Sequence, residues 1–291
     1  MSAPAVIRPA RASDAEAIAS FTKDTFEWGD YVPEAFPSWL NQPASHMVVA
    51  VDDDDSAIAM SRGRLVSATE AWFHAARVHP EWRGRGIAGE MADVLRAWAG
   101  AEGAVVGRLL IEDDNTASIR HVEKIGFRRV TSVVRGTKPV GDASPSPDGN
   151  GGRRVQSRLR ARPAHATEAT PAFASWSFGE LGRATRGLVG SHWTYARLTV
   201  DHLAAAAKSG SFWEIGGGWA VTDIEEGSLE VGWLETRPDD ATDLLKALID
   251  MAVGSGVESI SLWIPDVDWL VKVAKRLGFD TGRMGVYAVE L

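Results

Sequence analysis

A glycine-rich turn between a strand pattern and a helix pattern is well suited to bind an anion. It reads Val78-His-Pro-Glu-Trp-Arg-Gly-Arg-Gly-Ile-Ala88 and leads into an amphipathic stretch. The first turn of a helix offers unbonded main-chain N–H groups and about half a positive charge. Gly84 and Gly86 place no Cβ between a phosphate and the main chain, and Arg83 and Arg85 can pair with phosphate oxygens. The segment therefore predicts a pyrophosphate-binding turn, although it matches neither the nucleotide-binding P-loop nor the dinucleotide fingerprint.

Three side chains upstream of this turn could transfer protons or line a pocket. Glu70, Trp72 and His74 alternate along a predicted strand, so they share one of its faces. A carboxylate desolvated beside Trp72 would gain basicity, and an imidazole already titrates near neutral pH. We therefore take Glu70 and His74 as candidate general bases and Trp72 as a candidate pocket residue. The alternatives are a solvated Glu70 at the start of the strand and a His74 with only a structural role.

The composition narrows the chemistry and the partners. The chain has 291 residues and no cysteine, so it has no thiolate nucleophile, disulfide or cysteine-bound metal, and no other spacing suggests a metal site. A formal net charge of −8 argues against nucleic acid and favours a cationic or amine partner. No apolar run approaches the roughly 18–20 residues of a membrane span, and the N-terminus lacks a signal-peptide pattern. We expect a soluble, cytoplasmic protein that binds neither membrane nor nucleic acid.

The elements that position these residues alternate between strand and helix patterns, which predicts an α/β fold with a mixed sheet. In the first half the patterns predict strands at 5–9, 46–52, 57–66, 70–79, 104–111 and 128–135, and helices at 13–25, 33–41, 86–100 and 115–125. In the second half they predict a helical region at 167–208, strands at 212–222, 228–235, 257–263 and 283–290, and helices at 240–254 and 266–277. Three glycines at 216–218 predict a bulge or a close backbone contact within a sheet. The segment 137–152, rich in Gly, Pro, Ser and Asp, predicts the long mobile tip of a hairpin between strands 128–134 and 154–159.

The two halves of the sequence repeat each other. Arg8-Pro-Ala-Arg-Ala-Ser-Asp-Ala15 is similar to Arg162-Pro-Ala-His-Ala-Thr-Glu-Ala169, and both could cap a following helix. His121-Val-Glu-Lys-Ile-Gly-Phe127 and Val273-Ala-Lys-Arg-Leu-Gly-Phe279 both predict an amphipathic helix that ends at glycine and precedes a strand. An Ala-rich composition could produce the first match alone, but the two matches together predict a tandem duplication with domains at 1–160 and 161–291.

Two motifs of the first half resemble those of the GNAT superfamily of N-acetyltransferases. The glycine-rich turn matches the acyl-CoA signature Gln/Arg-x-x-Gly-x-Gly/Ala at Arg83, Gly86 and Ala88. Downstream, Asn115-Thr-Ala-Ser-Ile-Arg-His-Val-Glu-Lys-Ile-Gly-Phe127 resembles the superfamily's Asn-x-x-Ala-x-x-x-Tyr-Glu-Lys-x-Gly-Phe. The resemblance covers about residues 5–160.

The resemblance implies a mostly antiparallel, splayed sheet in which the pantetheine arm of acetyl-CoA lies between strands 70–79 and 104–111. It implies that acetyl-CoA is held by the main chain of two strand residues, by the turn and by one asparagine. These residues are Arg77, Val78, Arg83, Gly84, Arg85, Gly86, Ile87, Ala88 and Asn115. Glu70 precedes Arg83 by 13 residues (83 − 70), which is similar to the spacing of the general-base glutamate in the histone-acetyltransferase branch.

One position departs from the superfamily pattern. Val122 stands where a tyrosine usually protonates the coenzyme A thiolate, and valine cannot donate a proton. Ser118 lies one helical turn earlier on the same face and is the candidate proton donor, whereas the neighbouring His121 points about 100° away. A water molecule, unaided departure of the thiolate and a poor enzyme are the alternatives. Tyr31 falls in the helical region that usually builds the acceptor site and is a candidate pocket residue.

The second half resembles the same fold but lacks the signature. After strand 228–235 the chain reads Glu235-Thr-Arg-Pro-Asp-Asp-Ala-Thr-Asp243, which has no glycine and carries carboxylates that would repel a pyrophosphate. This half also contains seven of the 12 tryptophans, which predict either core packing or an aromatic cleft for a cationic acceptor. We expect a degenerate domain that binds no acetyl-CoA.

The sequence therefore predicts a tandem GNAT protein whose first domain transfers acetyl from acetyl-CoA to a primary amine by direct attack in a ternary complex. The acceptor is expected to be a small, cationic molecule. The alternative function is an acyl-CoA-binding regulator or scaffold that is catalytically weak or inactive. Because superfamily members often dimerise, both a homodimer and an internal pseudo-dimer of the two halves stay open.

Overall fold

The computed structural model of the protein describes residues 5–23, 25, 29–140, 159–191 and 193–291. The chain divides into two compact units. The first consists of Met1–Leu109, Thr116–Arg128 and Tyr287–Leu291, and the second of Leu110–Asn115 and Arg129–Val286. The predicted domain boundary after residue 160 follows the sequence repeat and stays a prediction.

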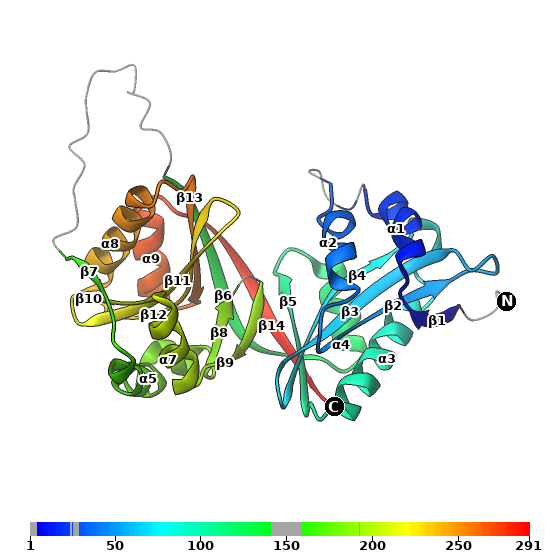
Figure 1. Cartoon of the computed structure of the whole chain (residues 1–291), viewed down its shortest axis with the longest axis horizontal. Coiled ribbons are helices and arrows are strands. Elements are labelled where there is room, and N and C mark those ends of the chain that lie inside the picture. The colour runs from blue at the N-terminus through cyan, green and yellow to red at the C-terminus, as the bar shows by residue number, and fades with distance from the viewer. Residues whose placement is uncertain (1–4, 24, 26–28, 141–158, 192) are drawn as a thin grey trace, which may run out of the picture. The chain divides into compact units, whose positions relative to one another are not determined.

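Five strands form the mixed sheet of the first unit in the spatial order β1, β2, β3, β4, β5 (Figure 1). All neighbours are antiparallel except β4 and β5, which are parallel. The strands are β1 (Val6–Pro9), β2 (Ser45–Val51), β3 (Ala57–Ser67), β4 (Glu70–Val78) and β5 (Val106–Glu112). The helices are α1 (Ala15–Thr22), α2 (Val32–Trp39), α3 (Ile87–Ala101) and α4 (Thr116–Lys124), with short 3₁₀ helices at Ala12–Asp14 and Pro80–Trp82.

Helices cover both faces of this sheet. On one face, Ile18 of α1 and Phe36 of α2 pack in one cluster with Met60 of β3. On the other face, a Cβ added at Gly63 would lie 3.1 Å from atoms of both Phe73 and Trp98, the latter from α3. Strand β4 is therefore buried from both sides, which explains its nearly continuous apolar start.

The second unit also has a mixed, mostly antiparallel sheet. Its sheet has the order β6, β13, β12, β11, β10, β7, and only β12 and β13 run parallel among the pairs described. The strands are β6 (Arg128–Pro139), β7 (Ala161–Pro163), β10 (Phe212–Ile215), β11 (Gly218–Glu225), β12 (Ser228–Glu235), β13 (Ser259–Pro265) and the last strand of the chain, β14 (Asp280–Glu290). The helices are α5 (Ala169–Phe178), α6 (Glu180–Ala184), α7 (Val200–Ser209), α8 (Ala241–Gly254) and α9 (Asp268–Arg276), with a 3₁₀ helix at Ala166–Glu168. A separate hairpin consists of β8 (Leu188–Ser191) and β9 (Thr194–Arg197).

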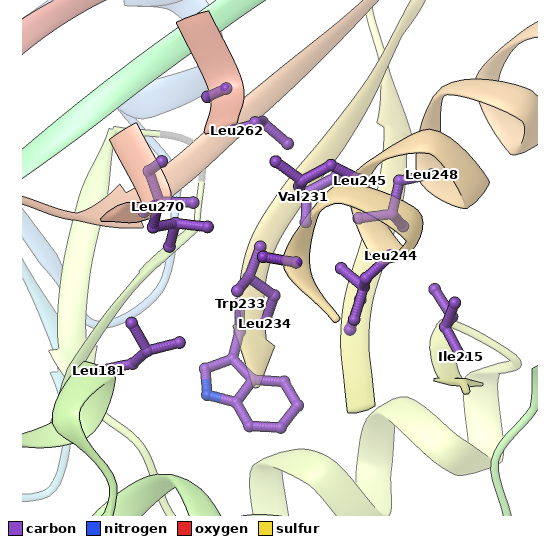
Figure 2. Close-up of a cluster of buried hydrophobic side chains, with 14 of the residues drawn as sticks. Leu181, Ile215, Val231, Trp233, Leu234, Leu244, Leu245, Leu248, Leu262 and Leu270 are labelled. Carbon is purple, nitrogen blue, oxygen red and sulfur yellow. The ribbon is translucent and has the colours of Figure 1, made fainter. Parts of the chain in front are cut away.

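The core of the second unit lies where α8 meets this sheet. Leu244 and Leu248 stand one helical turn apart on α8 and point toward Val231 and Leu234 of β12 (Figure 2). All four side chains are at most 3% exposed. The predicted α/β class, with a mostly antiparallel sheet flanked by helices, is confirmed.

Two predicted elements were wrong or incomplete, and a third lies largely outside the described residues. The predicted helical region 167–208 contains the hairpin β8–β9, whose short strands have too few residues to show a clear period. The predicted strand 212–222 is a hairpin of β10 and β11, because Gly216 and Gly217 both have positive φ, 58° and 87°, and form a tight turn rather than a bulge. The third glycine makes the close backbone contact that was the alternative, since a Cβ at Gly218 would lie 2.6 Å from the main-chain oxygen of Glu235. The predicted strand 154–159 and most of the loop 137–152 lie outside the described residues, while β6 extends to Pro139 and pairs along β13.

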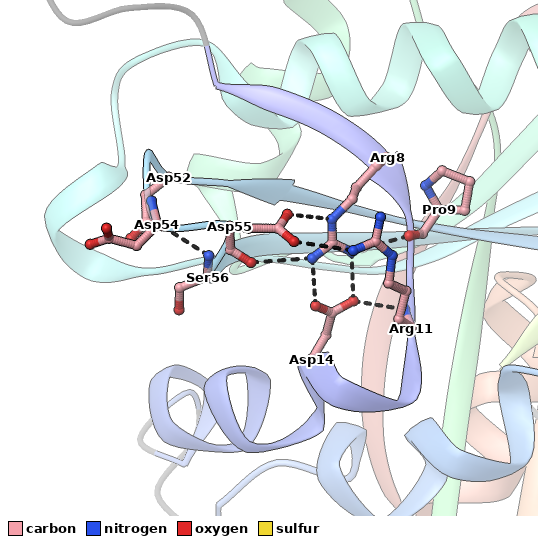
Figure 3. Close-up of polar contacts among 8 residues, drawn as sticks. All are labelled: Arg8, Pro9, Arg11, Asp14, Asp52, Asp54, Asp55 and Ser56. Carbon is pink, nitrogen blue, oxygen red and sulfur yellow. Dashed lines mark hydrogen bonds and ion pairs between the residues drawn. The ribbon is translucent and has the colours of Figure 1, made fainter.

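An ion pair at the start of each unit explains the sequence repeat. In the first unit, the guanidinium of Arg8 donates to both carboxylate oxygens of Asp14 at 2.8 and 2.9 Å, and Arg11 N donates to the same carboxylate at 2.7 Å (Figure 3). Asp55, the last residue of the aspartate run, pairs with both arginines. The run therefore anchors the turn after β2 to the start of α1.

The second unit has the same ion pair. Arg162 donates to both oxygens of the Glu168 carboxylate at 2.8 and 2.9 Å, and His165 N donates to it at 2.9 Å. In both units this pair joins a strand to the 3₁₀ turn that begins the first helix. The ion pair therefore accounts for this part of the sequence repeat.

Candidate active site

Among the described residues, strand β4 pairs with β5 only along its first three residues. Within the described chain, the parallel ladder of these strands joins Glu70, Ala71 and Trp72 to Val106, Gly107 and Arg108, and continues no further. On the β3 side, Ala75 and Ala76 together stand opposite a single residue, Ser61, so β4 has a β-bulge there. Ala75 has φ of 57°, a left-handed conformation that costs energy for a residue with a Cβ. The bulge turns β4 away from β5 and leaves its second half splayed.

The glycine-rich turn follows this splay. Gly84 and Gly86 have φ of 76° and 90°, which only glycine adopts without strain. Gly86 is the N-cap of α3 and makes no side-chain cap, so the first N–H groups of the helix, those of Ile87 and Ala88, have no capping side chain. A Cβ at Gly84 would meet no atom within 4 Å, which means that the turn is open. The turn thus has the form of an anion cradle.

Two exposed arginines border the cradle. Arg83 Nε donates to the main-chain oxygen of Val78 at 3.2 Å, so its side chain folds back along the end of β4. Arg85 lies over the ring of Trp82 at 4.5 Å and donates to the main-chain oxygen of Glu81 at 3.0 Å. Both guanidiniums are on the solvent side and have donors left for a phosphate.

Helix α4 lies beside the first turn of α3. A Cβ at Gly89 would lie 3.5 Å from Ile125 and 3.9 Å from the ring of His121. Burial, reinforced by the charge of Lys124, lowers the pKa of His121, so its ring is neutral at pH 7. Val122 is 7% exposed and belongs to the core. Asn115 precedes α4 and Ser118 lies in its first turn, and their predicted roles stay predictions.

Glu70 is buried in an ion pair. Its Oε1 accepts a hydrogen bond from Arg108 Nη1 at 2.7 Å, and both side chains are 8% exposed. Trp72 stands opposite Arg108 in the ladder and is 2% exposed. The Glu70 carboxylate is therefore withdrawn from water, but its partner is a guanidinium rather than an apolar wall.

His74 is held by an arginine as well. Arg62 on β3 stands directly opposite His74, and its Nη1 donates to His74 Nε2 at 3.0 Å. Burial, with the added charges of Arg62, Arg64 and Arg77, lowers the pKa of His74 to about 3. A group whose conjugate acid is this strong takes a proton from an ammonium poorly. This environment argues against the predicted role of His74 as a general base.

Aromatic side chains and arginines pack around His74. The ring of Trp39 meets the His74 ring edge-on at 5.2 Å and lies 4.8 Å from the guanidinium of Arg62. Tyr31, which is 41% exposed, meets Trp39 at 5.9 Å and lies under Arg77 at 5.6 Å. Tyr31 and Trp39 flank α2, so this helix places the cover over β4.

Arg77 is fixed by Asp30. Its Nε and Nη2 donate to the two oxygens of this carboxylate at 2.6 and 3.2 Å. Burial disfavours the charged carboxylate, but the hydrogen bonds and charge of Arg77 outweigh this effect and the pKa of Asp30 lies below its ordinary value. The Arg77 side chain thus faces Asp30 and Tyr31.

The structure brings most of the predicted site residues onto one strand and the turn after it. Glu70, Trp72, His74 and Arg77 lie on β4, and the cradle follows directly. Sequence analysis missed the residues that β3 and β5 supply, namely Arg62, Arg64 and Arg108, and missed Asp30 and Trp39. The signal for the first two was their alternation, Arg-x-Arg, inside a strand that is otherwise apolar.

The second unit has a splay in the corresponding place, but its own chain fills it. The parallel ladder of β12 and β13 covers Ser228–Val231, and Gly232 is the bulge residue without a direct partner on β11. A Cβ at Gly232 would lie 2.5 Å from the main-chain oxygen of Gly190 in β8. A Cβ at Gly190 would in turn lie 2.8 Å from the ring of Tyr195. The hairpin β8–β9 therefore packs directly against this bulge.

Three of the seven tryptophans in this half of the chain are core residues, whereas Trp193 is 45% exposed. Trp176, Trp233 and Trp263 are 2–4% exposed. Trp263 Nε1 donates to Glu230 at 2.7 Å, and Trp269 Nε1 donates to Glu180 at 2.9 Å. Of the two interpretations of these tryptophans, core packing explains these positions.

Two observations concern other kinds of function. Among the described residues, no group of three or more His, Asp and Glu side chains could hold a metal ion. Each helix in the described part of the chain is too short or too polar to cross a membrane.

Comparisons with known proteins agree with this geometry. Residues 15–127 match the model of the acetyltransferase (GNAT) family. No curated protein matches the chain in sequence. Among solved structures, a GCN5-related N-acetyltransferase from Sphaerobacter thermophilus aligns with a TM-score of 0.68 and 16% identity, over 98% of this chain and 95% of that one.

Two further structures share the fold. A GCN5-related N-acetyltransferase from Kribbella flavida aligns with a TM-score of 0.51 and 13% identity, over 97% of this chain and 71% of that one. The glucosamine N-acetyltransferase region of a fungal multi-domain β-N-acetylglucosaminidase aligns with a TM-score of 0.65 and 13% identity, over 99% of this chain and 38% of that one. At these identities the likeness concerns the fold alone.

Proposed function

Since this chain belongs to the acetyltransferase (GNAT) family through residues 15–127, we propose that its first unit transfers acetyl from acetyl-CoA to a primary amine. The observation that carries the proposal is the splay of β4 from β5, which ends at an open glycine cradle on the N-terminus of α3. A slot between two strands suits the extended pantetheine arm, and a helix N-terminus suits its pyrophosphate. The same residues therefore fit acetyl-CoA better than a compact nucleotide.

The cradle supplies the positive charge that would balance the negative charge of the pyrophosphate. The main-chain N–H groups from Gly84 to Ala88 and the α3 dipole act on one side, and Arg83 and Arg85 act from the solvent side. In the splay, the main chain of Arg77 and Val78 pairs with the amides of the pantetheine arm. These assignments follow the family pattern and the exposed position of the turn.

The chemical step joins the acceptor nitrogen to the thioester carbon. The neutral amine attacks the carbonyl, the new C–N bond forms and the C–S bond breaks, and the coenzyme A thiolate leaves. One proton leaves the nitrogen and one proton returns to the thiolate, so the step is balanced without a covalent acyl-enzyme. The bulge at Ala75 and Ala76 lies at the splay, where main-chain N–H groups can stabilise the carbonyl oxygen.

Glu70 is the proton acceptor in this scheme and acts through intervening water, because it lies five residues along β4 from the bulge at Ala75 and Ala76. It is the buried carboxylate at the closed end of the splay, and Arg108 holds it in one position at 2.7 Å. Because His74 has a pKa of about 3, we assign it a positioning role with Arg62 rather than proton transfer. Tyr31 and Trp72 line the acceptor side, and Ser118 or a water molecule returns the proton to sulfur because the buried Val122 cannot.

The second unit binds no acetyl-CoA in this proposal. Its splay is filled by β8, and its turn carries Asp239 and Asp240 where a pyrophosphate would need positive charge. We infer that it is a degenerate copy of the first unit.

A specific observation also favours the alternative function, an acyl-CoA-binding protein that has lost catalysis. This observation is the buried Val122 in place of a proton donor. The test is release of coenzyme A thiol from acetyl-CoA in the presence of a panel of primary amines. A thiol reagent reads only coenzyme A here, because the protein has no cysteine. Amine-dependent release supports the transferase, whereas acetyl-CoA binding without release by any amine supports the alternative.

A further inference from the structure

Arg62 is a buried cation whose charge no described carboxylate balances. Arg62 is only 2% exposed to solvent. Its hydrogen-bond partners, His74 Nε2 and Gln42 Oε1, are both neutral, and its Nε has no partner. The third contact is the face of Trp39 at 4.8 Å. Burial lowers the pKa of Arg62 to about 10, so it still carries its charge at neutral pH.

Two nearby arginines, unlike Arg62, each have a carboxylate that balances their positive charge. Arg77 has the carboxylate of Asp30 at 2.6 Å, and Arg108 has that of Glu70 at 2.7 Å. A guanidinium without such a partner is costly to bury. The cost falls if an anion approaches from outside when the site is in use, because a charge-assisted hydrogen bond in a dry site is strong.

The position of Arg62 links this charge to the reaction. Arg62 faces His74, and the bulge at Ala75 begins at the next residue of β4. In the proposed function the acetyl group lies at that bulge. A ligand group at Arg62 would therefore be only a few bonds away from an amine at the acetyl carbon. The cover over Arg62 comes from Trp39 and Gln42, which flank the end of α2, and Tyr31 at its other end is 41% exposed.

We propose that the acceptor is a small primary amine that also carries an anionic group, a carboxylate or a phosphate, and that Arg62 binds this anionic group. The inference rests on the proposed function and names its substrate class. It differs from the expectation drawn from the net charge of −8, which favoured a cationic acceptor. The local charges beside the bulge, rather than those of the whole surface, select the acceptor.

The test compares matched pairs of amines on the full chain. The carboxylate pair is glycine and glycinamide, and the phosphate pair is phosphoethanolamine and ethanolamine. Each pair presents a primary amine with and without the anion. We measure kcat and KM for thiol release with wild type, Arg62→Gln and Arg62→Lys, and use Arg11→Gln as the control because Arg11 is an exposed arginine at the start of α1. Comparing each variant with wild type cancels the intrinsic reactivity of each amine.

We expect Arg62→Gln to lower kcat/KM for the anionic member of one pair at least tenfold more than for its neutral partner, mainly through KM. Arg62→Lys should restore part of the loss, and Arg11→Gln should change neither member. The pair that responds identifies carboxylate or phosphate. A loss that is equal for both members would mean that Arg62 only supports the fold, and would overturn the inference.

Two further measurements keep the inference falsifiable. If Arg62→Gln does not fold, two other results test the inference. The wild type should prefer the anionic member of one pair over its neutral partner, and Arg62→Lys should reduce that preference. If acetyl-CoA binds but no amine reacts, calorimetric titration of the same pairs into the coenzyme A complex decides, and equal or absent binding of both members overturns the inference. Failure of the proposed function has a different signature: either acetyl-CoA binds to no variant, including wild type, or it binds and no amine releases thiol with any of them.

Discussion

Arg62 Nη1 donates a hydrogen bond to His74 Nε2 at 3.0 Å, between neighbouring strands of the first unit. Because a guanidinium can only donate, the imidazole accepts at Nε2 and keeps its own proton on Nδ1. The bond thus fixes the neutral tautomer of a ring that is already buried among positive charges. A histidine placed on the acceptor side of a catalytic strand is thereby withdrawn from proton transfer.

The first prediction concerns the pH dependence of stability. Burial and three arginine charges lower the pKa of His74 from 6.5 to about 3 in the folded state. Below pH 6.5 the unfolded chain gains a proton that the folded chain does not, so this contribution to stability is complete above pH 6.5 and is lost as the pH falls toward 3. Relative to His74→Gln, the wild type should lose up to about 1.4 kcal/mol per pH unit in this window. Urea unfolding of both proteins at pH 8, 6.5 and 5.5 measures this loss. The same pH dependence of the unfolding midpoint in the two proteins would contradict the prediction.

The second prediction concerns Glu70. Glu70→Gln keeps a hydrogen-bond acceptor for Arg108 but removes the base, so kcat should fall by about 10²-fold or more with unchanged affinity for acetyl-CoA. Asp14→Asn is the matched control, because Asp14 is 4% exposed and is paired with Arg8 at 2.8 Å, at the start of α1. The control should lose stability and keep its rate. Equal loss of kcat in the two variants would remove Glu70 from the chemistry.

The third prediction concerns packing at the closed end of the splay. A Cβ at Gly107 would lie 2.2 Å from Phe73 Cε2, so Gly107→Ala should destabilise the first unit by about 1–3 kcal/mol. Gly100 lies in α3 with no atom within 4 Å of a Cβ, so Gly100→Ala should instead stabilise by about 0.5–1 kcal/mol. Denaturant unfolding of both variants checks the opposite signs. Two changes of the same sign would show that β4 and β5 can move apart at Gly107.

Local chemistry was predictable from the sequence. Gly84 and Gly86 mark the turn because positive φ is a property of single residues, and the strand and helix on either side have clear periods. The same is true of the repeat, since Arg8 and Asp14 are only a few residues apart and their ion pair recurs at Arg162 and Glu168.

The environment of the candidate bases was not predictable in this way. Asp30 and Arg77 are separated by 47 residues, and Glu70 and Arg108 by 38. Their pairing depends on sheet order, which sequence periodicity does not fix. The hairpin β8–β9 was missed for a related reason, because its burial against Gly232, rather than any local pattern, makes it a pair of strands.

The central claim is that the first unit alone binds acetyl-CoA, at the cradle before α3. Calorimetric titration of acetyl-CoA into wild type tests it most directly, beside Gly86→Glu, Arg85→Glu and Gly100→Glu. Gly86→Glu places a carboxylate in the cradle, and Arg85→Glu does the same without straining a left-handed residue. Gly100→Glu is the control, on the same helix but about 20 Å away.

The account predicts one site per chain with micromolar affinity, lost in Gly86→Glu, weakened at least tenfold in Arg85→Glu and unchanged in Gly100→Glu. Circular dichroism confirms that each variant is folded. Two sites per chain, no binding by the wild type, or binding that survives in a folded Gly86→Glu would contradict it.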